Sequence, residues 1–134
     1  MSSIPADIRY TESHEYLKPT ADPTVFSVGV TDFAQGELGD VVYLDLPKPG
    51  ATYGAHDAFG TIEAVKAVSD IYSPVAGEVV EVNPRLEGEP SLVNNDPYGE
   101  GWMIKLKINP ADAATLMDAA AYEAHLAVGG GSHH

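Results

Sequence analysis

Short apolar segments separated by proline and glycine recur along most of the chain. They are rich in Val, Ile, Thr, Tyr and Phe, and several alternate apolar with polar positions, which is typical of β-strands. We predict one or two strands within residues 9–18 and further strands at 24–30, 41–46, 58–65, 67–73, 79–82 and 103–108. Short strands with frequent turns predict a mainly β fold, arranged as a two-sheet sandwich or flattened barrel with short flanking helices.

The helical signals are few and lie beside the strands. Predicted helices span residues 33–38, 111–117 and 119–126. Thr31 or Asp32 provides an N-cap for the first helix, and Gly39 ends it. Asn109 and Pro110 form a helix start, and the alanine-rich segment that follows is a good helix former. We therefore expect a C-terminal helical segment that packs on the edge of a sheet.

A seven-residue pattern occurs twice in the β-rich part of the chain. GDVVYLD at residues 39–45 resembles GEVVEVN at residues 77–83, and Gly50 and Gly88 keep the same offset of 38 residues (77−39 and 88−50). Gly-acid-Val-Val is a common strand opening, so chance similarity is the alternative, but the longer match favours a true repeat. Neither unit can bury a face alone, so two packed units predict a sandwich with approximate two-fold symmetry.

Lys66 lies between the two repeats, where the predicted strands 58–65 and 67–73 must be joined by a tight turn. A lone surface lysine is ordinarily a solvated charge. Here small or apolar neighbours flank it, while Glu63 and Asp70 stand three and four residues away. An exposed amine with acids nearby is protonated and is a poor nucleophile, so Lys66 is better suited to attachment than to catalysis.

Composition excludes several classes of function. With 20 acids and 7 bases the net charge is −13, which argues against nucleic-acid binding and suits attraction to a partner with a positive patch. The chain has no cysteine, and no run of about 18 apolar residues predicts a membrane span. The start lacks a basic leader, so we expect a cytoplasmic protein. We predict one domain over residues 1–128 of the 134, with residues 129–134 as a linker and tag remnant.

Several ordered motifs resemble one protein family. The segment around Lys66, GTIEAVKAVSDIYSPVAGEVVEVN at residues 60–83, is similar to the lipoyl-attachment region of glycine cleavage system H proteins. The resemblance continues in four further segments: RYTESHEY at 9–16, GVTDFAQ at 29–35, LGDVV at 38–42 and NNDPYGEGWM at 94–103. Tyr16 stands where the family usually has tryptophan, and Ala76 where serine is frequent. Neither departure touches the modification site.

The resemblance implies a fold, a cofactor and partners. It implies a lipoyl-domain-like barrel-sandwich hybrid that carries lipoic acid in amide linkage to Lys66 and does not catalyse. It implies four partners: the pyridoxal-phosphate glycine decarboxylase (P protein), the tetrahydrofolate-dependent aminomethyltransferase (T protein), dihydrolipoyl dehydrogenase (L protein) and lipoate-attaching enzymes. It also places Ser13, Glu15 and Asp70 in a cleft that receives the loaded arm, with Glu15 as the charge contact. Recognition by the attaching enzyme is assigned to Glu63, Val65 and Ala67.

Other classes of function remain open at this point. An H-like protein that relays octanoyl or lipoyl groups would use the same lysine. A biotin carrier usually flanks its lysine with methionine, and lipoyl domains of 2-oxo acid dehydrogenases commonly place aspartate before it, whereas Val65 and Ala67 flank Lys66. An enzyme using His14 and Glu15 lacks a nucleophile and metal-ligand spacing, so we expect no catalytic and no metal site. A purely structural module would leave the lysine unmodified. Trp102 is expected in the core.

Overall fold

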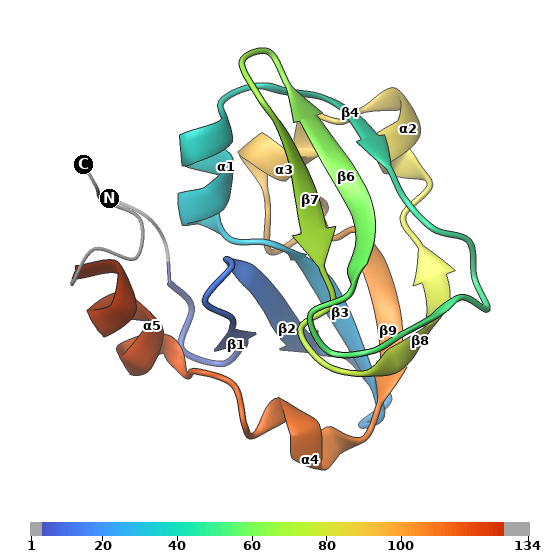
Figure 1. Ribbon diagram of the computed structural model, residues 1–134, viewed down its shortest axis with the longest axis vertical. Coiled ribbons are helices and arrows are strands. Elements are labelled where there is room, and N and C mark those ends of the chain that lie inside the picture. Colours follow the sequence, from blue (N-terminus) through green and yellow to red (C-terminus); the bar gives the residue numbers. More distant parts are fainter. Residues whose placement is uncertain (1–3, 128–134) are drawn as a thin grey trace.

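The computed structural model describes residues 4–127 and consists of two antiparallel sheets with short helices around them (Figure 1). The strands are β1 Arg9–Tyr10, β2 Glu15–Pro19, β3 Val25–Val30, β4 Val41–Asp45, β5 Thr52–Tyr53, β6 Ala58–Ala64, β7 Val68–Tyr72, β8 Gly77–Val82 and β9 Ile104–Ile108. The helices are α1 Asp32–Leu38, α2 Arg85–Gly88, α3 Leu92–Asn95, α4 Pro110–Ala113 and α5 Ala119–His125. The predicted fold class is therefore confirmed.

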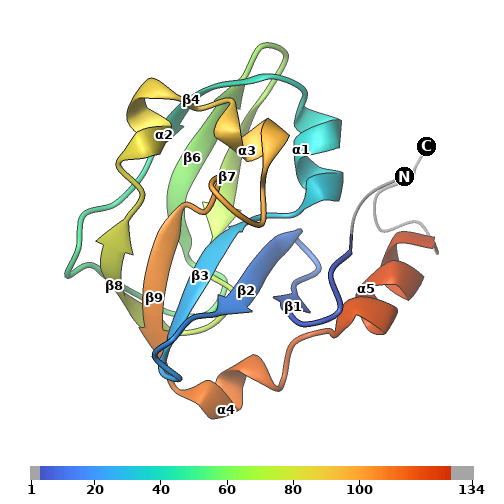
Figure 2. The same cartoon turned by 180° about the vertical axis from the view of Figure 1, so that it is seen from behind.

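The larger sheet has the strand order β1-β2-β3-β9-β8-β5, and the smaller has the order β4-β6-β7. Figures 1 and 2 show the two sheets facing each other. Their inner faces share one apolar core, which includes Val28 of β3, Leu106 of β9 and Ile62 of β6. Alternation of buried and exposed positions along these strands explains why the sequence pattern located them.

The repeat appears as two equivalent strands. The first copy forms β4 in the smaller sheet, and the second forms β8 in the larger one, so each sheet receives one copy. The two copies of the repeat differ in structure after these strands. Gly50 turns at a φ of 97° and donates its N–H to the carbonyl of Val79, whereas Gly88 is the last residue of α2. The repeat thus predicts the sandwich but not the connections that follow each strand.

The predicted helices are only partly correct. Thr31 caps α1 by accepting a hydrogen bond from the N–H of Ala34, and Gly39 ends it at a φ of 81°, as expected. The helix expected over residues 111–117 is wrong beyond Ala113, where the chain enters turns. The sequence patterns missed α2, α3 and the two-residue strand β5. None of the helices between residues 4 and 127 has the length and apolar character needed to cross a bilayer.

Asn94 and Trp102, in the motif over residues 94–103, make structural contacts. Asn94, on α3, donates to the carbonyl of Gly39 and accepts from the N–H of Val41, so it joins the end of α1 to the start of β4. Trp102 is half-buried instead of lying in the core, and Lys105 places its amine 4.9 Å from the centre of the indole ring. The expectation of a core tryptophan is therefore wrong.

A second, smaller core holds α5 against the larger sheet. Tyr10 and Tyr122 stack with ring centroids 4.5 Å apart, and Ile8 and Tyr16 complete the cluster. Burial removes these tyrosines from water and raises the pKa of Tyr10, Tyr16 and Tyr122. The domain expected over residues 1–128 stays a prediction, and residues 129–134, expected to be a tag remnant, lie outside the described part of the chain.

Candidate functional site

Lys66 lies at the tip of the hairpin formed by β6 and β7, and Figure 1 shows this tip projecting beyond the rest of the smaller sheet. Glu63 and Val68 face each other as the last paired residues, and the N–H of Ala64 donates to the carbonyl of Ala67 over 2.8 Å. The tip is also hydrogen-bonded to the segment before β4, because the N–H of Val65 donates to the carbonyl of Asp40 over 3.1 Å. The lysine is therefore exposed on a braced turn.

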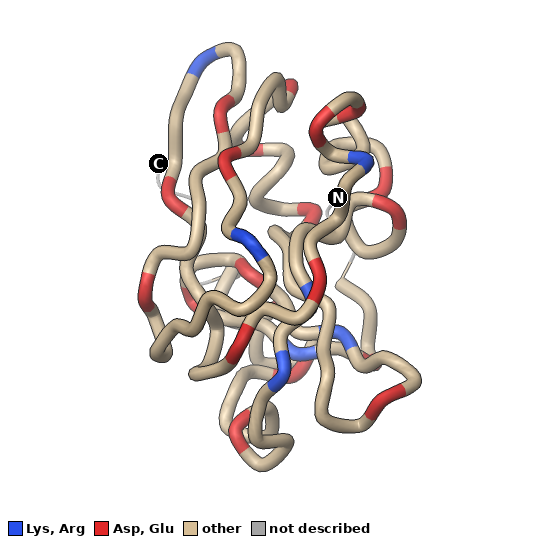
Figure 3. Tube along the Cα trace, turned by 90° about the vertical axis from the view of Figure 1, so that its right-hand side faces the viewer, with Lys and Arg blue, Asp and Glu red and all other residues tan. Residues whose placement is uncertain are grey.

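The surroundings of Lys66 are acidic but do not pair with it. Glu63 and Asp70 are exposed, and none of the ion pairs among residues 4–127 involves Lys66. Figure 3 shows acidic positions spread over much of the chain and few basic ones. A free, solvated amine at the end of a hairpin is accessible to another protein, which is what a covalent attachment point requires.

A pocket of about 270 Å³ lies between β2, α1 and the edge strand β7. Its lining includes Ser13, Glu15 and Asp70, so the three residues assigned to one cleft do lie around one cavity. The other lining residues are His14, Val30, Phe33, Ala34, Glu37, Leu38, Ile62 and Ser69. Sequence reasoning did not assign these to the cleft. The apolar positions of the predicted helix over residues 33–38 were the one signal that could have indicated this wall.

Glu15 is buried in the wall of this pocket, with only 2% of its surface exposed. Its carboxylate accepts hydrogen bonds from Oγ1 of Thr11 (2.8 Å), from Oγ of Ser13 (2.5 Å) and from the backbone N–H of Tyr72 (3.2 Å). Burial raises the pKa of Glu15 above its ordinary value, and these hydrogen bonds oppose the rise. Glu15 is therefore not an ordinary solvated surface residue. Its hydrogen bond with Thr11 is not predicted by the sequence.

His14 forms the rim of the pocket from an unusual backbone conformation. Its φ is 72°, a region that non-glycine residues rarely adopt. The ring is held by a 2.8 Å hydrogen bond between Nδ1 and the hydroxyl of Tyr122, and it lies against Phe33 with centroids 4.9 Å apart. The same tyrosine hydroxyl bonds Thr31, so α5 and the start of α1 both position the rim.

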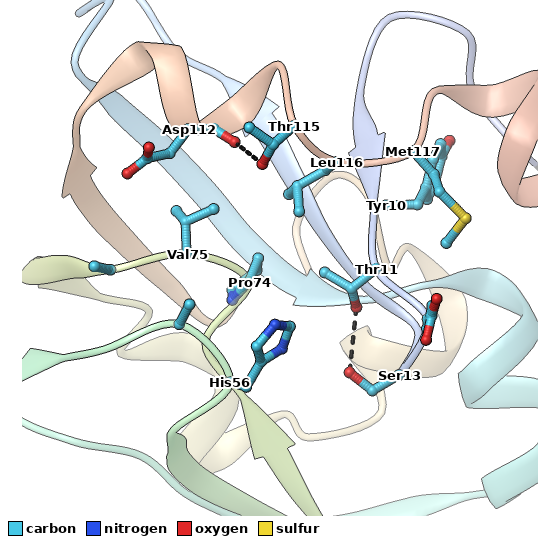
Figure 4. A pocket seen from close by; sticks show the side chains of 13 residues that line it. Tyr10, Thr11, Ser13, His56, Pro74, Val75, Asp112, Thr115, Leu116 and Met117 are labelled. Atoms are coloured by element: carbon cyan, nitrogen blue, oxygen red, sulfur yellow. Dashed lines mark hydrogen bonds between the residues drawn. The ribbon is translucent and has the colours of Figure 1, made fainter.

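A larger cavity of about 650 Å³ lies on the other side of Ser13 (Figure 4). In Figure 4, His56 and Val75 stand on one side of it, and Leu116, from the connection between α4 and α5, stands on the other. Ser13 belongs to the lining of both cavities and shares a 3.3 Å hydrogen bond with Thr11. Among the residues of this lining, the sequence predicts Ser13 alone as a site residue.

The fold and the exposed hairpin lysine resemble those of one class of protein, the small two-sheet domains that carry a prosthetic group on a lysine. Comparison with known proteins narrows this class. The family model described as glycine cleavage H-protein matches residues 8–128. The glycine cleavage system H protein of Marinobacter nauticus is 52% identical over 128 residues, covering 95% of this chain and 98% of the relative. That of Opitutus terrae is 54% identical over 123 residues, covering 91% and 96%.

A solved structure agrees with these relatives. The crystal structure of a glycine cleavage system H protein from Mycobacterium marinum has a TM-score of 0.83 to this chain at 34% identity, and it covers 92% of this chain and 99% of that one. The chain therefore belongs to the glycine cleavage system H-protein family, whose members are lipoyl carriers and not catalysts. The resemblance and the expectation of a non-enzyme are confirmed.

Proposed function

We propose that this chain carries a lipoyl group in amide linkage to Lys66 and shuttles the aminomethyl group of glycine between the enzymes of the glycine cleavage system. The observation that carries the proposal is the position of Lys66: an exposed, unpaired amine on a braced hairpin tip, in a chain of the H-protein family. When attached, a lipoyl group supplies a disulfide that accepts the aminomethyl group and a dithiol that is later reoxidised.

The chain's own residues suit this role. Lys66 supplies the amine for attachment, and Glu63, Val65 and Ala67 beside it are exposed to the attaching enzyme. In the pocket, Ser13, Glu15 and Asp70 receive the cationic end of the arm. Glu15 is suited to this contact because a positive charge beside a buried carboxyl favours its ionised form, so an arriving ammonium group finds its counter-charge at the pocket wall.

The partners follow from the same proposal. Glycine decarboxylase loads the carrier, the aminomethyltransferase unloads it onto tetrahydrofolate, and dihydrolipoyl dehydrogenase restores the disulfide. A lipoate-attaching enzyme must act first. The net charge of −13 favours association with partners that present basic surfaces, and we place the chain in the cytoplasm with these enzymes.

Reconstitution tests the proposed role. The lipoylated chain is mixed with a decarboxylase, an aminomethyltransferase and a dihydrolipoyl dehydrogenase from a related bacterium, and glycine-dependent transfer of carbon to tetrahydrofolate is measured. We expect transfer with the wild-type chain and none with Lys66→Arg. In parallel, the gene is introduced into cells with a glycine-cleavage defect and into cells with a lipoate-relay defect. Rescue of the relay defect alone, with no transfer in the reconstituted system, would contradict the proposal in favour of lipoyl relay.

A further inference from the structure

Exposed apolar side chains gather around the attachment hairpin. Among the residues that the structure describes, five large hydrophobic side chains are exposed, and four of them lie here: Val42 (49% exposed), Tyr43 (54%), Val65 (70%) and Val68 (67%). The fifth, Val80, belongs to β8 of the other sheet. Single exposed apolar residues are ordinary, but a group of them beside a functional residue is typical of a surface that binds another protein.

The strand register joins these residues into one surface. Tyr43 pairs with Glu63, and Glu63 pairs with Val68, so the three side chains form a row across β4, β6 and β7. A β-bulge between Val41 and Tyr43 interrupts the pairing of β4. Strict alternation would turn one of two consecutive residues inward, but beside the bulge both Val42 and Tyr43 are exposed. The strand thus presents two adjacent apolar residues to solvent.

This surface is connected to the hairpin that carries Lys66. The hydrogen bond from the N–H of Val65 to the carbonyl of Asp40 connects the tip to the residue that precedes β4. Acidic side chains accompany the apolar ones: Asp40 and Asp45 lie beside them and Glu63 lies between Tyr43 and Val68. All three are exposed and take no part in the ion pairs among residues 4–127. A complementary partner would therefore combine an apolar patch with basic side chains around it.

We propose that Val42 and Tyr43 of β4, together with Val65 and Val68, form the docking surface for the enzyme that attaches the lipoyl group to Lys66. This inference rests on the proposed function. During attachment, Nζ attacks the acyl carbon of an activated lipoyl donor such as an acyl-adenylate. An amide bond forms, the bond to the nucleotide phosphate breaks, and Nζ loses a proton. The bare lysine stem is short, so the attaching enzyme must contact the hairpin itself, whereas later partners meet a lysine lengthened by its arm.

The test measures modification of the unmodified chain by a lipoate ligase from a related bacterium, supplied with lipoate and ATP. Initial rates are followed by intact mass at several chain concentrations. We expect Tyr43→Ala to lower kcat/KM about tenfold, chiefly through a higher KM, because a central apolar anchor is truncated. Val68→Ser should act in the same direction. Tyr43→Phe keeps the ring and should remain near the wild-type rate.

Val80→Ser is the matched control, because it removes an exposed valine from the other sheet and should leave the rate unchanged. Calorimetric titration of the ligase with each unmodified chain gives an affinity that does not depend on turnover, and it should fall in parallel. Thermal unfolding shows whether Tyr43→Ala is folded. If it is not, the rate measured for Val68→Ser tests the proposal instead. Equal kcat/KM values for Tyr43→Ala, Val68→Ser and Val80→Ser would overturn the proposal. So would normal attachment combined with impaired loading by the decarboxylase. Absence of any modification of the wild-type lysine would instead contradict the proposed function.

Discussion

The backbone N–H of Tyr72 donates a hydrogen bond to Oε2 of Glu15 over 3.2 Å. Tyr72 ends β7, the strand that leaves the hairpin tip, and Glu15 begins β2 of the other sheet. The bond therefore ties the strand that follows Lys66 to the buried acid of the pocket. The strand that follows Lys66 therefore forms part of the pocket wall, which places the pocket beside the hairpin that we propose to carry the arm.

The role of Glu15 can be separated from that of Lys66 by substitution. Glu15→Gln keeps the size of the side chain but removes its charge. We expect normal lipoylation and faster loss of the aminomethyl group from the loaded carrier, because the cationic amine loses its counter-charge. Glu15→Ala should speed this loss in the same way. It should also reduce the free energy of unfolding by about 1–3 kcal/mol, because the buried hydroxyl of Thr11 and the N–H of Tyr72 lose this acceptor. The measurement is the rate at which the loaded form loses its aminomethyl group. An unchanged rate in both variants would show that Glu15 does not protect this group.

Glu15 also predicts a pH dependence of stability. Burial raises the pKa of Glu15 above its ordinary value of 4.5, so the folded chain holds this proton more tightly than the unfolded chain does. The resulting stabilisation is fully present below pH 4.5 and is lost as the pH rises through the folded pKa. Urea unfolding at a series of pH values should therefore show the wild-type chain losing stability relative to Glu15→Gln as the pH rises. A difference that is constant, or that changes in the opposite direction, would contradict the raised pKa.

Two glycines form a matched pair for a test of packing. A Cβ at Gly60 would clash with the carbonyl oxygen of Asp45, where β4 and β6 approach closely, whereas a Cβ at Gly36 meets nothing within 4 Å. Gly60→Ala should destabilise the chain by about 1–3 kcal/mol, because backbone must shift. Gly36→Ala, within α1, should stabilise it by up to about 1 kcal/mol. Chemical denaturation measures both, and a neutral Gly60→Ala would show that the strands can separate at no cost.

The hydroxyl of Tyr122 is expected to hold the rim of the pocket. It bonds both His14 and Thr31 over 2.8 Å and is fully buried. Tyr122→Phe should reduce the free energy of unfolding by about 1–3 kcal/mol, because the buried hydroxyl of Thr31 and the half-buried ring of His14 each lose a partner. Tyr43→Phe, at an exposed ring, should have almost no effect. Equal stability of the two variants in thermal unfolding would exclude a structural role for this hydroxyl.

The sequence predicted those parts of the fold that depend on local pattern. Alternating apolar positions located the main strands, and cap residues such as Thr31 and Gly39 located α1. The four-residue helices α2 and α3 were missed because they are single turns, and their formation coincides with burial of Leu86 and Val93. Such burial depends on residues far along the chain and leaves no periodic signal.

The same distinction holds for the site. Lys66 could be found from the sequence because the repeat and the turn between two strands surround it. The burial of Glu15 could not, because it results from Thr11, Ser13 and Tyr72 meeting around one carboxylate, with Tyr72 57 residues away. The exposed face of β4 was also missed, since it depends on a bulge that only strand pairing reveals.

The central claim, that Lys66 carries a lipoyl group, is tested most directly by the mass of the Lys66-containing peptide from protein isolated from its native cells. We predict that the wild-type peptide carries the added mass of a lipoyl group on Lys66 and that the corresponding peptide of Lys66→Arg carries none. A peptide from native cells that is unmodified or biotinylated, or a Lys66→Arg chain that still gains the lipoyl mass, would contradict the account.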